Sequence, residues 1–465
     1  MDAIDFKNKA EADSNSQSGR KWIYPRIIKG KLYQFRNWLS YFLLLLMFSG
    51  PFIKMNGEQL ILFNILERKF VFFGVIFWPQ DFYLFVLAML TFMVFIILFT
   101  AVFGRVWCGW ACPQTIFMEM LFRKIENWIE GGWVKQKKLN ESALTFEKVW
   151  KKGLKHSLFA LISFFIANIF LAYIIGTDEL IKIISEPVGQ HLVGFSSITL
   201  FTIIFYLVFA YIRELVCTVI CPYGRLQGVL LDNKSLIVAY DYERGEPRGK
   251  INKHVDVAAP LGDCIDCNVC VHVCPTGIDI RKGTQLECIN CTACIDACDM
   301  VMEKIHRPIR LIGFKSEKQI KTREAFGFGK RVYWYSAILF IMVAVLTTLI
   351  IQRSDIQATI LRAAGTLYQE RKDGTVSNLY NAELINKTAF PVAFTLQPAE
   401  ADTRIVYIQK QDSLQKGESV KLTFFIVRAQ KAVSEYKSNI ELDVLLNGKV
   451  IDKVKTTFIA PPNLN

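Results

Sequence analysis

What the sequence lacks narrows its class first. It has only 5 histidines in 465 residues, and residues 352–465 contain neither cysteine nor histidine. His156 and His191 lie near long apolar runs, but we place them on opposite sides of a membrane, so no haem held by paired histidines is expected. The first 36 residues are polar and basic and lack the apolar core of a signal peptide, so we expect no cleaved signal.

Long apolar runs are what the sequence has in abundance. The composition is 52% hydrophobic with 36 Phe, and a helix needs about 20 apolar residues to cross a bilayer. A further stretch, 60–78, is interrupted by Glu67, Arg68 and Lys69 and is interpreted as an interfacial or re-entrant piece. The pattern predicts a multi-pass α-helical membrane protein, although a count of four or six crossings stays open. The predicted spans are 37–53, 82–103, 156–175, 193–212 and 332–351.

The net charge of +13 could indicate nucleic acid or a membrane as the partner. Its distribution favours the membrane and excludes nucleic acid as the expected partner. Residues 1–37 carry eight Lys or Arg and residues 105–155 carry ten, whereas residues 176–192 carry only Lys182. Because positive residues mark the cytoplasmic side, we expect a cytoplasmic N-terminus, five crossings with an uncleaved first anchor, and a C-terminal domain outside.

Twelve cysteines remain to be explained, and this topology puts all of them at the cytoplasmic face. Thiols there are kept for metal or redox chemistry rather than for disulfides. The strongest pattern is "CIDCNVCVHVCP" at 264–275 and "CINCTACIDACD" at 288–299. Each is C-x2-C-x2-C-x3-C, the spacing with which three cysteines wrap one iron–sulfur cube while the fourth ligates the other cube.

This crossing rule gives two [4Fe–4S] clusters with four ligands each. Zinc is the competing interpretation, but zinc sites close at four ligands and pair two C-x2-C elements. Asp299 follows the second run where many ferredoxins have proline, which leaves the ligand set unchanged. His272, inside the first run, is expected to tune a cluster or lie exposed rather than bind iron. The first cluster is assigned to Cys264, Cys267, Cys270 and Cys298, and the second to Cys288, Cys291, Cys294 and Cys274.

A second repeated element follows two of the apolar runs. "WCGWACP" and "VCTVICP" both contain Cys-x-x-x-Cys-Pro, at Cys108 with Cys112 and at Cys217 with Cys221. On a helix, residues four apart share a face, so each pair is predicted to point the same way and the two pairs to converge. Four thiols would suit a soft ion such as Cu(I). The alternative is that these cysteines pack as small apolar residues beside proline kinks.

The remaining segments complete the predicted organisation. The connection 105–155 is expected to hold an amphipathic helix, with apolar residues near Met120, Ile125, Trp128 and Ile129 at helical spacing. The last hundred residues show alternating runs that predict an immunoglobulin-like β-sandwich held by packing alone. The predicted domains are a basic arm at 1–36, spans at 37–213 with the second Cys-x-x-x-Cys-Pro at 217–222, a dicluster α+β ferredoxin-like domain at 214–330, a last span at 331–352 and the outer sandwich at 353–465.

These motifs together resemble the cytochrome c oxidase accessory proteins known as CcoG, FixG or RdxA. The resemblance runs over nearly the whole chain, from "WCGWACPQTIFMEMLFRKIE" and "CTVICPYGRLQGVLLD" through "CPTGIDIRKGTQLECINCTACIDACD" to the outer domain. It implies a polyferredoxin of the bacterial inner membrane that supports maturation of cbb-type cytochrome oxidase by reducing Cu(II) to Cu(I), an oxidoreductase of cupric-reductase type. It also implies oxidase-assembly and copper-delivery proteins as partners, and Cys108, Cys112, Cys217 and Cys221 as the family's membrane cysteine motif.

Two other functions stay open at this point. The protein could be an electron-transfer subunit that receives electrons from a quinol and passes them to a respiratory reductase, or an assembly scaffold whose clusters only stabilise the fold. The residues do not identify the electron donor, which could be a cytoplasmic protein or a quinol.

Overall fold

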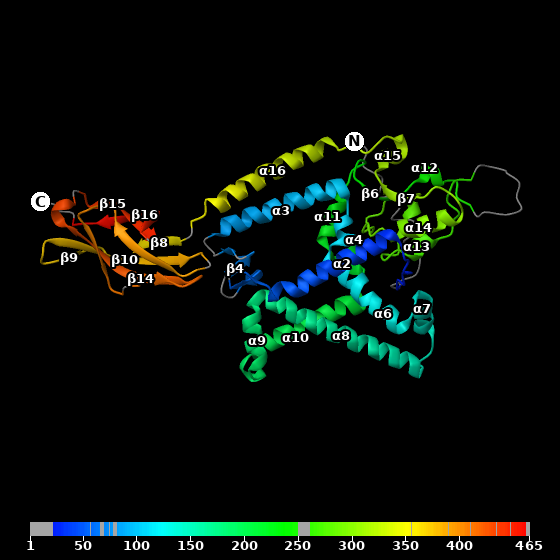
Figure 1. Ribbon diagram of the computed structural model, residues 1–465, viewed down its shortest axis with the longest axis horizontal. Coiled ribbons are helices and arrows are strands. Elements are labelled where there is room, and N and C mark those ends of the chain that lie inside the picture. Colours follow the sequence, from blue (N-terminus) through cyan, green and yellow to red (C-terminus); the bar gives the residue numbers. More distant parts are fainter. Residues whose placement is uncertain are drawn as a thin grey trace, which may run out of the picture. The chain divides into compact units, whose positions relative to one another are not determined.

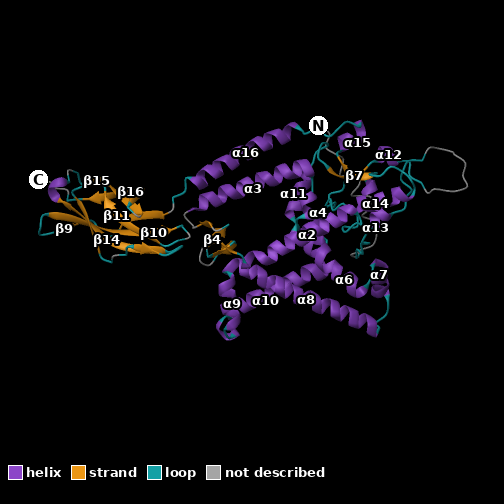
Figure 2. Ribbon diagram, viewed as in Figure 1, coloured by secondary structure: helices purple, strands orange, loops and turns teal. Residues whose placement is uncertain are grey.

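The computed structural model describes residues 22–55, 57–65, 69–73, 75–77, 81–249, 261–354, 356–388, 390–409, 411–433, 435–446 and 448–461. The chain forms two compact units. The first contains 1–42, 99–161 and 205–329, and the second contains 43–98, 162–204 and 330–465. Figures 1 and 2 show the helices and strands of both. Most of the predicted basic arm, residues 1–21, lies outside the described residues.

Four described helices are long and apolar enough to cross a membrane. They are α3 (Phe82–Phe103), α8 (Phe146–Ile175), α10 (Leu192–Leu207) with the π-helical extension η5 (Val208–Ile212), and α16 (Lys330–Ile351). None of the most apolar stretch of α16 is buried within the protein, and apolar side chains left uncovered over such a length fit a lipid environment. These helices make the chain a membrane protein and correspond to four of the five predicted spans.

The first predicted span is different. Its residues form helix α2 (Lys31–Ser49), which starts six residues before the predicted boundary at 37 and is followed by the 3-10 turn η1 (Gly50–Phe52). Its first two turns carry Lys31 and a buried Arg36. Because the uninterrupted apolar part begins only after these polar turns, α2 is not among the helices that meet the length and composition of a span. The fifth crossing is therefore not confirmed.

In the first unit, short elements connect the long helices. After α3 come α4 (Val106–Trp110), α5 (Pro113–Thr115), the π-helical segment η3 (Ile116–Phe122), α6 (Arg123–Glu130) and α7 (Trp133–Glu141). The predicted amphipathic helix is therefore interrupted, because Gly131 takes a φ of 88° that ends α6. Trp128 is 78% exposed, while Arg123 and Glu126 are buried. The elements that follow η5 are η6 (Val216–Ile220), α11 (Pro222–Leu230), β6 (Ile237–Tyr240), α12 (Tyr242–Gly245), α13 (Val269–His272), η7 (Ile280–Lys282), α14 (Ala293–Lys304), β7 (Ile312–Lys315) and α15 (Glu317–Thr322).

The second unit holds most of the β-structure. The stretch interpreted as interfacial forms a three-stranded antiparallel sheet of β3 (Ile61–Asn64), β4 (Lys69–Phe72) and β5 (Val75–Phe77) rather than a helix. It is preceded by the short pair β1 (Lys54–Met55) and β2 (Glu58–Gln59), and α9 (Thr177–Ser185) and the 3-10 turn η4 (Val188–Gln190) connect α8 to α10.

The C-terminal region is an all-β sandwich. One sheet has the order β12 (Thr403–Tyr407), β14 (Ser419–Ala429), β10 (Thr375–Asn386) and β8 (Ile356–Arg362), with β9 (Gln369–Glu370) paired to β10. The other has β13 (Ser413–Leu414), β11 (Val392–Pro398), β15 (Lys437–Leu446) and β16 (Lys449–Ile459). Inward residues such as Tyr380, Phe424, Leu442 and Phe458 are fully buried, so packing alone supplies the core, as predicted from the absence of cysteine.

One buried carboxylate ties this sandwich to the start of α3. Asp81 lies next to α3 and is 2% exposed, and its two oxygens accept from Lys387 Nζ at 2.5 Å and from Arg353 Nη2 at 2.7 Å. Both cationic side chains are also buried, at 5% and 9% exposed. A charge in such a place is tolerated only when it is paired.

We therefore expect Asp81→Asn to leave two buried cations without their counter-charge and to cost about 3–5 kcal/mol of stability. Thermal unfolding of the detergent-solubilised protein measures the loss. Asp178→Asn is the matched control, because Asp178 pairs with Lys54 at the surface, where the side chains are 78% and 43% exposed, and such pairs contribute under about 1 kcal/mol. Equal unfolding temperatures for the two variants would contradict the role given to Asp81.

Candidate metal centre

The eight cysteines of the ferredoxin-like runs surround two neighbouring cavities of nearly equal volume, about 360 and 340 Å³. Cys270 lines both. The cysteines around the first are Cys264, Cys267, Cys270 and Cys298. Those around the second are Cys274, Cys288, Cys291 and Cys294, with Cys270 at the edge. The fourth cysteine of each run thus lies beside the first three cysteines of the other run, which is the arrangement that the crossing rule predicts.

The two cysteine loops also share their backbone conformation. Asp266 and Asn268 in the first loop and Asn290 and Thr292 in the second all have positive φ, between 51° and 66°. They stand at equivalent positions, two residues after the first cysteine and one after the second. Asn and Asp tolerate this left-handed conformation best, whereas Thr292 is β-branched and strained there. Successive turns of this kind aim backbone N–H groups into a concavity that suits an anionic cluster.

The donor chemistry of these cavities fits iron–sulfur clusters. Burial raises the pKa of Cys270, Cys288 and Cys298 to about 12, so the thiols carry protons at neutral pH until metal cations displace them. Each cavity also has a buried guanidinium close by. Arg281, whose side chain is 7% exposed, lines the first cavity and donates to Asp279 at 2.7 Å. In the second, Arg36 donates to the carbonyl of Cys291 at 2.9 Å.

A single metal ion fits less well. In the described part of the chain no three His, Cys, Asp or Glu side chains are gathered closely enough to hold one ion. The cysteines instead line the walls of their cavities. His272, the other candidate ligand, is exposed and stacks on Trp133 with ring centroids 5.5 Å apart. It does not line either cavity.

The Cys-x-x-x-Cys-Pro elements differ from the prediction. Cys108 lies in α4 and Cys217 in η6, but Cys112 and Cys221 are outside these helices, with extended ψ of 126° and 111°. Each is the residue before the proline that starts the next helix. A residue before proline is forced out of the helical region, so the premise of one shared helix face is wrong. Both elements nevertheless adopt the same backbone conformation. The N–H of Cys112 donates to the carbonyl of Trp107 and the N–H of Cys221 donates to the carbonyl of Val216, in each case five residues back.

The first of these elements packs against the second cluster loop. Cys108 lies in one buried apolar cluster with Ile289 and Cys291, and Cys217 packs against that cluster. Gly109 makes the closest approach, since a Cβ added there would lie 2.4 Å from the carbonyl oxygen of Ile289 and 2.8 Å from Cys291 Cα. Trp110 Nε1 donates to the carbonyl of Asn290 at 3.2 Å. The structure thus places the start of the thiol pair against the wall of the second cavity.

Comparison with known proteins relates most of the chain to one family. It is 33% identical to Protein RdxB of Cereibacter sphaeroides over 389 residues, covering 80% of this chain and 81% of that protein. It is 34% identical to Protein RdxA of the same bacterium over 391 residues, with the same coverage. The nitrogen fixation protein FixG of Rhizobium meliloti is 34% identical over 303 residues, 63% of this chain and 57% of FixG. The chain belongs to the FixG/RdxA family.

Three family models agree with this assignment. Residues 212–317 match a 4Fe-4S dicluster domain, residues 85–138 a 4Fe-4S binding domain, and residues 346–461 the IG-like fold at the C-terminus of FixG. The crystal structure of a FixG-related protein from Vibrio parahaemolyticus is 20% identical and covers 23% of this chain and 97% of its own, with a TM-score of 0.21. This FixG/RdxA-family protein is thus an iron–sulfur electron-transfer protein with an Ig-like C-terminal domain.

Several polar residues of this site were not predicted from the sequence. Gln227, fully buried in α11, accepts from Cys108 Sγ at 3.2 Å and from Arg105 Nε at 3.1 Å. Arg105 also donates to the carbonyl of Leu286. Gln227 stands in a motif already quoted, six residues after Cys221, and Arg105 lies three residues before Cys108, just outside the other motif. An ionisable residue directly after an apolar span was a usable signal, since such positions are costly unless they have a role.

Burial also raises the pKa of the membrane-boundary thiols, that of Cys108 to about 11 and that of Cys217 to about 12. Arg105 acts in the opposite direction on Cys108, and the neighbouring cysteines add to the rise on Cys217. In the FixG/RdxA-family protein these cysteines are therefore neutral thiols at physiological pH, and a soft cation is what would ionise them.

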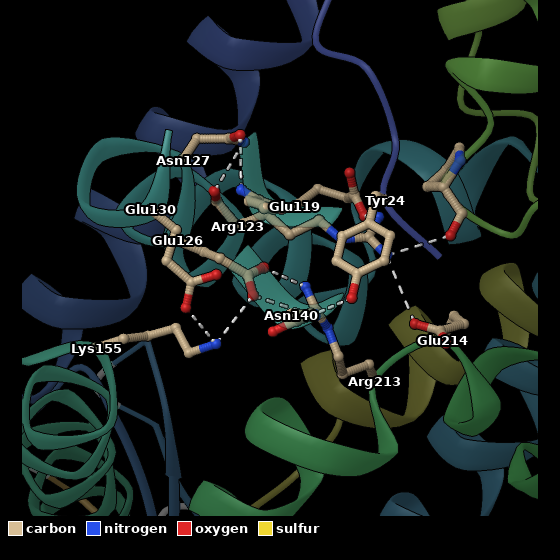
Figure 3. A network of polar contacts seen from close by, with 12 residues as sticks. Tyr24, Glu119, Arg123, Glu126, Asn127, Glu130, Asn140, Lys155, Arg213 and Glu214 are labelled. Carbon is tan, nitrogen blue, oxygen red and sulfur yellow. Dashed lines mark hydrogen bonds and ion pairs between the residues drawn. The ribbon is translucent and has the colours of Figure 1, made fainter. Parts of the chain in front are cut away.

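A buried charge network lies beside Pro275, at the end of the first cysteine run (Figure 3). Arg123 donates to Glu119, to Glu214 at 3.5 Å and to the carbonyl of Pro275 at 3.3 Å. Glu126 accepts from Arg213 at 2.7 Å and from Lys155 at 3.3 Å. Burial alone would raise the pKa of Glu126, but these cations outweigh it and lower the pKa to about 2. Glu126 is therefore ionised throughout the physiological range.

The close approach at Gly109 yields a test. Gly109→Ala forces backbone of the Ile289–Cys291 loop to move, so we expect a loss of about 1–3 kcal/mol together with weaker iron retention and an altered EPR spectrum of the reduced protein. Gly153→Ala is the control, because a Cβ there meets nothing within 4 Å. If Gly109→Ala kept its iron and stability as well as Gly153→Ala does, the contact would not matter.

Proposed function

We propose that this protein is a membrane-bound cupric reductase, which carries single electrons through two [4Fe–4S] clusters to a thiol site and reduces Cu(II) to Cu(I) there. The observation that supports this most is the packing of Cys108 and Gly109 on the Ile289–Cys291 loop. It connects the cluster domain to the thiol site through backbone contact.

The proposed ligand sets follow the two cavities. Cys264, Cys267, Cys270 and Cys298 hold one cluster, and Cys274, Cys288, Cys291 and Cys294 hold the other. A cubane of this kind supplies reversible one-electron transfer, with a potential set by net charge, hydrogen bonds and exposure. Arg36 and Arg105 place positive charge beside the second cavity. They favour the extra electron on that side, next to the Cys-x-x-x-Cys-Pro elements.

The thiol site is suited to copper by its softness. Cys108 and Cys217 are neutral as free thiols. Once ionised, the thiolates of Cys108, Cys112, Cys217 and Cys221 prefer Cu(I) to harder ions. Each Cu(II) takes one electron, so a protein reduced by two electrons delivers two Cu(I). The buried Gln227 and Arg105 fix the orientation of Cys108 while the ion changes charge.

The biological setting is part of the proposal. Cu(I) made here would support assembly of cbb-type cytochrome c oxidase, with copper-delivery and oxidase-assembly proteins as partners. The chain would lie in the bacterial inner membrane with its cluster domain in the cytoplasm and the Ig-like domain in the periplasm. With the four confirmed helices and α2 as a fifth crossing, the N- and C-termini lie on opposite sides, as this arrangement requires.

The crossing of ligands can be tested with single substitutions. We expect Cys298→Ser to perturb the cluster of the first run and Cys274→Ser that of the second run, since each cysteine lines the other run's cavity. EPR of the reduced protein, after iron and sulfide analysis, distinguishes the two signals. The contrary result would be that Cys298→Ser alters the EPR signal that Cys291→Ser alters and leaves unchanged the signal that Cys264→Ser alters. Each run would then hold its own cluster.

The copper step is tested on anaerobic protein reduced with dithionite and freed of excess reductant. Wild-type protein should reduce about one Cu(II) per electron stored, as measured with a Cu(I)-specific chelator. A variant with alanine at Cys108, Cys112, Cys217 and Cys221 should reduce Cu(II) far more slowly while it retains both clusters. Wild-type rates in that variant would contradict the thiol site. Iron analysis adds a second check, because eight iron atoms fit two clusters, whereas twelve would assign these four thiols to a further cluster.

A further inference from the structure

A cavity lies beside the second cluster loop, within the same unit as the Cys-x-x-x-Cys-Pro contact. Its walls come from α2 and the chain before it, from η3, α6 and α7, and from the two cysteine runs. None of the functions assigned above uses it. Its apolar lining is Ile23, Pro25, Ile27, Ile28, Val273, Pro275 and Ala293, and its polar lining is Arg26, Tyr33, Arg36, Glu119, Arg123, Glu126, Asn127, Gln136 and Asp296.

Two buried guanidinium groups at this cavity are incompletely bonded. Arg36 and Arg123 are both 3% exposed, and the Nε of each has no hydrogen-bond partner among the described residues. A buried N–H left without a partner costs about 1–3 kcal/mol. Such groups beside a cavity indicate a ligand with hydrogen-bond acceptors.

The charges of the cavity indicate a neutral ligand. Its lining has three arginines and three carboxylates, so an anion gains no net attraction. The N-terminus of α2 at this cavity is already occupied, because Asp296 accepts the backbone N–H of Leu32 and of Tyr33, at 3.3 and 2.7 Å. A dinucleotide or other phosphate-bearing donor is therefore disfavoured.

The position of the cavity indicates a ligand that exchanges electrons and comes from the membrane. Pro275 follows Cys274 and Ala293 precedes Cys294, and both line it. Arg36 and Arg123 reach from the cavity to the carbonyls of Cys291 and Pro275. On the opposite side, Glu126 pairs with Lys155 in α8 and with Arg213 directly after the span that ends at Ile212. The cavity thus lies between a cluster loop and the ends of two membrane helices.

We propose that this cavity binds a quinol, which supplies electrons to the cluster held by Cys274, Cys288, Cys291 and Cys294. This inference rests on the proposed function, since it names the electron donor. A quinol is neutral, lipid-soluble and planar, and its oxygens can accept hydrogen bonds from Arg36 and Arg123. Ile27, which is 45% exposed, marks the edge of the cavity where the ring enters.

The reaction balances with the clusters as oxidant. The quinol loses two electrons and two protons and becomes the quinone, and the two [4Fe–4S] clusters each take one electron. Glu126 is committed to Arg213 and Lys155. Among the described residues Glu119 is paired with one cation, Arg123, whereas Glu126 is paired with two. We therefore assign to Glu119 the hydrogen bond of the quinol hydroxyl and the first proton, with solvent as the final acceptor of both protons.

The experiment uses the full-length holoprotein in detergent and a dimethylnaphthoquinone, whose quinone ring has no free position for addition of cysteine thiols. Equilibrium dialysis against oxidised protein should show one saturable site. Ile27→Trp, which narrows the entrance at an exposed position, and Glu119→Gln should each weaken binding, and both should slow reduction of the clusters by the corresponding quinol about tenfold or more. Glu141→Gln is the control, because Glu141 is a surface residue paired only with Lys137 among the described residues.

The outcomes separate this inference from the proposed function. Dithionite should still reduce the clusters of both variants, and the reduced variants should reduce Cu(II) at the wild-type rate. Absence of saturable binding to wild-type protein, or binding that neither substitution changes, overturns the quinol site. Failure of dithionite-reduced wild-type protein to reduce Cu(II) overturns the cupric reductase and leaves the quinol measurement valid.

Discussion

The contact between Gly109 and the Ile289–Cys291 loop is the constraint on which the site depends. Only a residue without a side chain allows α4 to lie so close to that loop, because a Cβ would fall 2.4 Å from a carbonyl oxygen. Trp110 and Arg105 fix the same contact by donating to the carbonyls of Asn290 and Leu286. Without this approach, the membrane-boundary thiols and the cluster cavities would be two separate features.

Buried charge is the second theme of the structure. Arg36, Arg123 and Arg213 would be expensive in an apolar setting, and each has a carboxylate or a backbone carbonyl as its partner. Two of them reach the loops that carry cluster cysteines. The same residues therefore stabilise the fold at the membrane boundary and place positive charge beside a cofactor that gains negative charge on reduction.

Repetition gives the protein its local geometry. The two cysteine runs have left-handed residues at equivalent positions, and the two Cys-x-x-x-Cys-Pro elements have the same hydrogen bond from the second cysteine to the fifth residue before it. At all of these positions except Thr292, the local sequence favours the observed conformation. Asn and Asp favour positive φ, and proline forces the preceding cysteine into an extended conformation. The contacts between the repeated elements depend on the tertiary structure instead.

The sequence by itself determined the class of the protein and its cofactor. Four of the long apolar runs form helices that can span a membrane, because length and composition decide that on their own. Spacing predicted iron–sulfur clusters, since the wrap around a cube is a short-range constraint, and the assignment of Cys298 and Cys274 to the other run's cluster stays a prediction. Alternating runs likewise predicted the C-terminal sandwich.

Tertiary structure decided the rest. The helix face expected to hold Cys108 with Cys112 is absent, and α2 begins earlier than predicted because its first turn binds Asp296, 264 residues away in the chain. The sequence did not predict the roles of Gln227, Arg36 and Glu119 either. The role of a single polar residue depends on the partners that the tertiary structure brings near it. Neither periodicity nor spacing in the sequence predicts those partners.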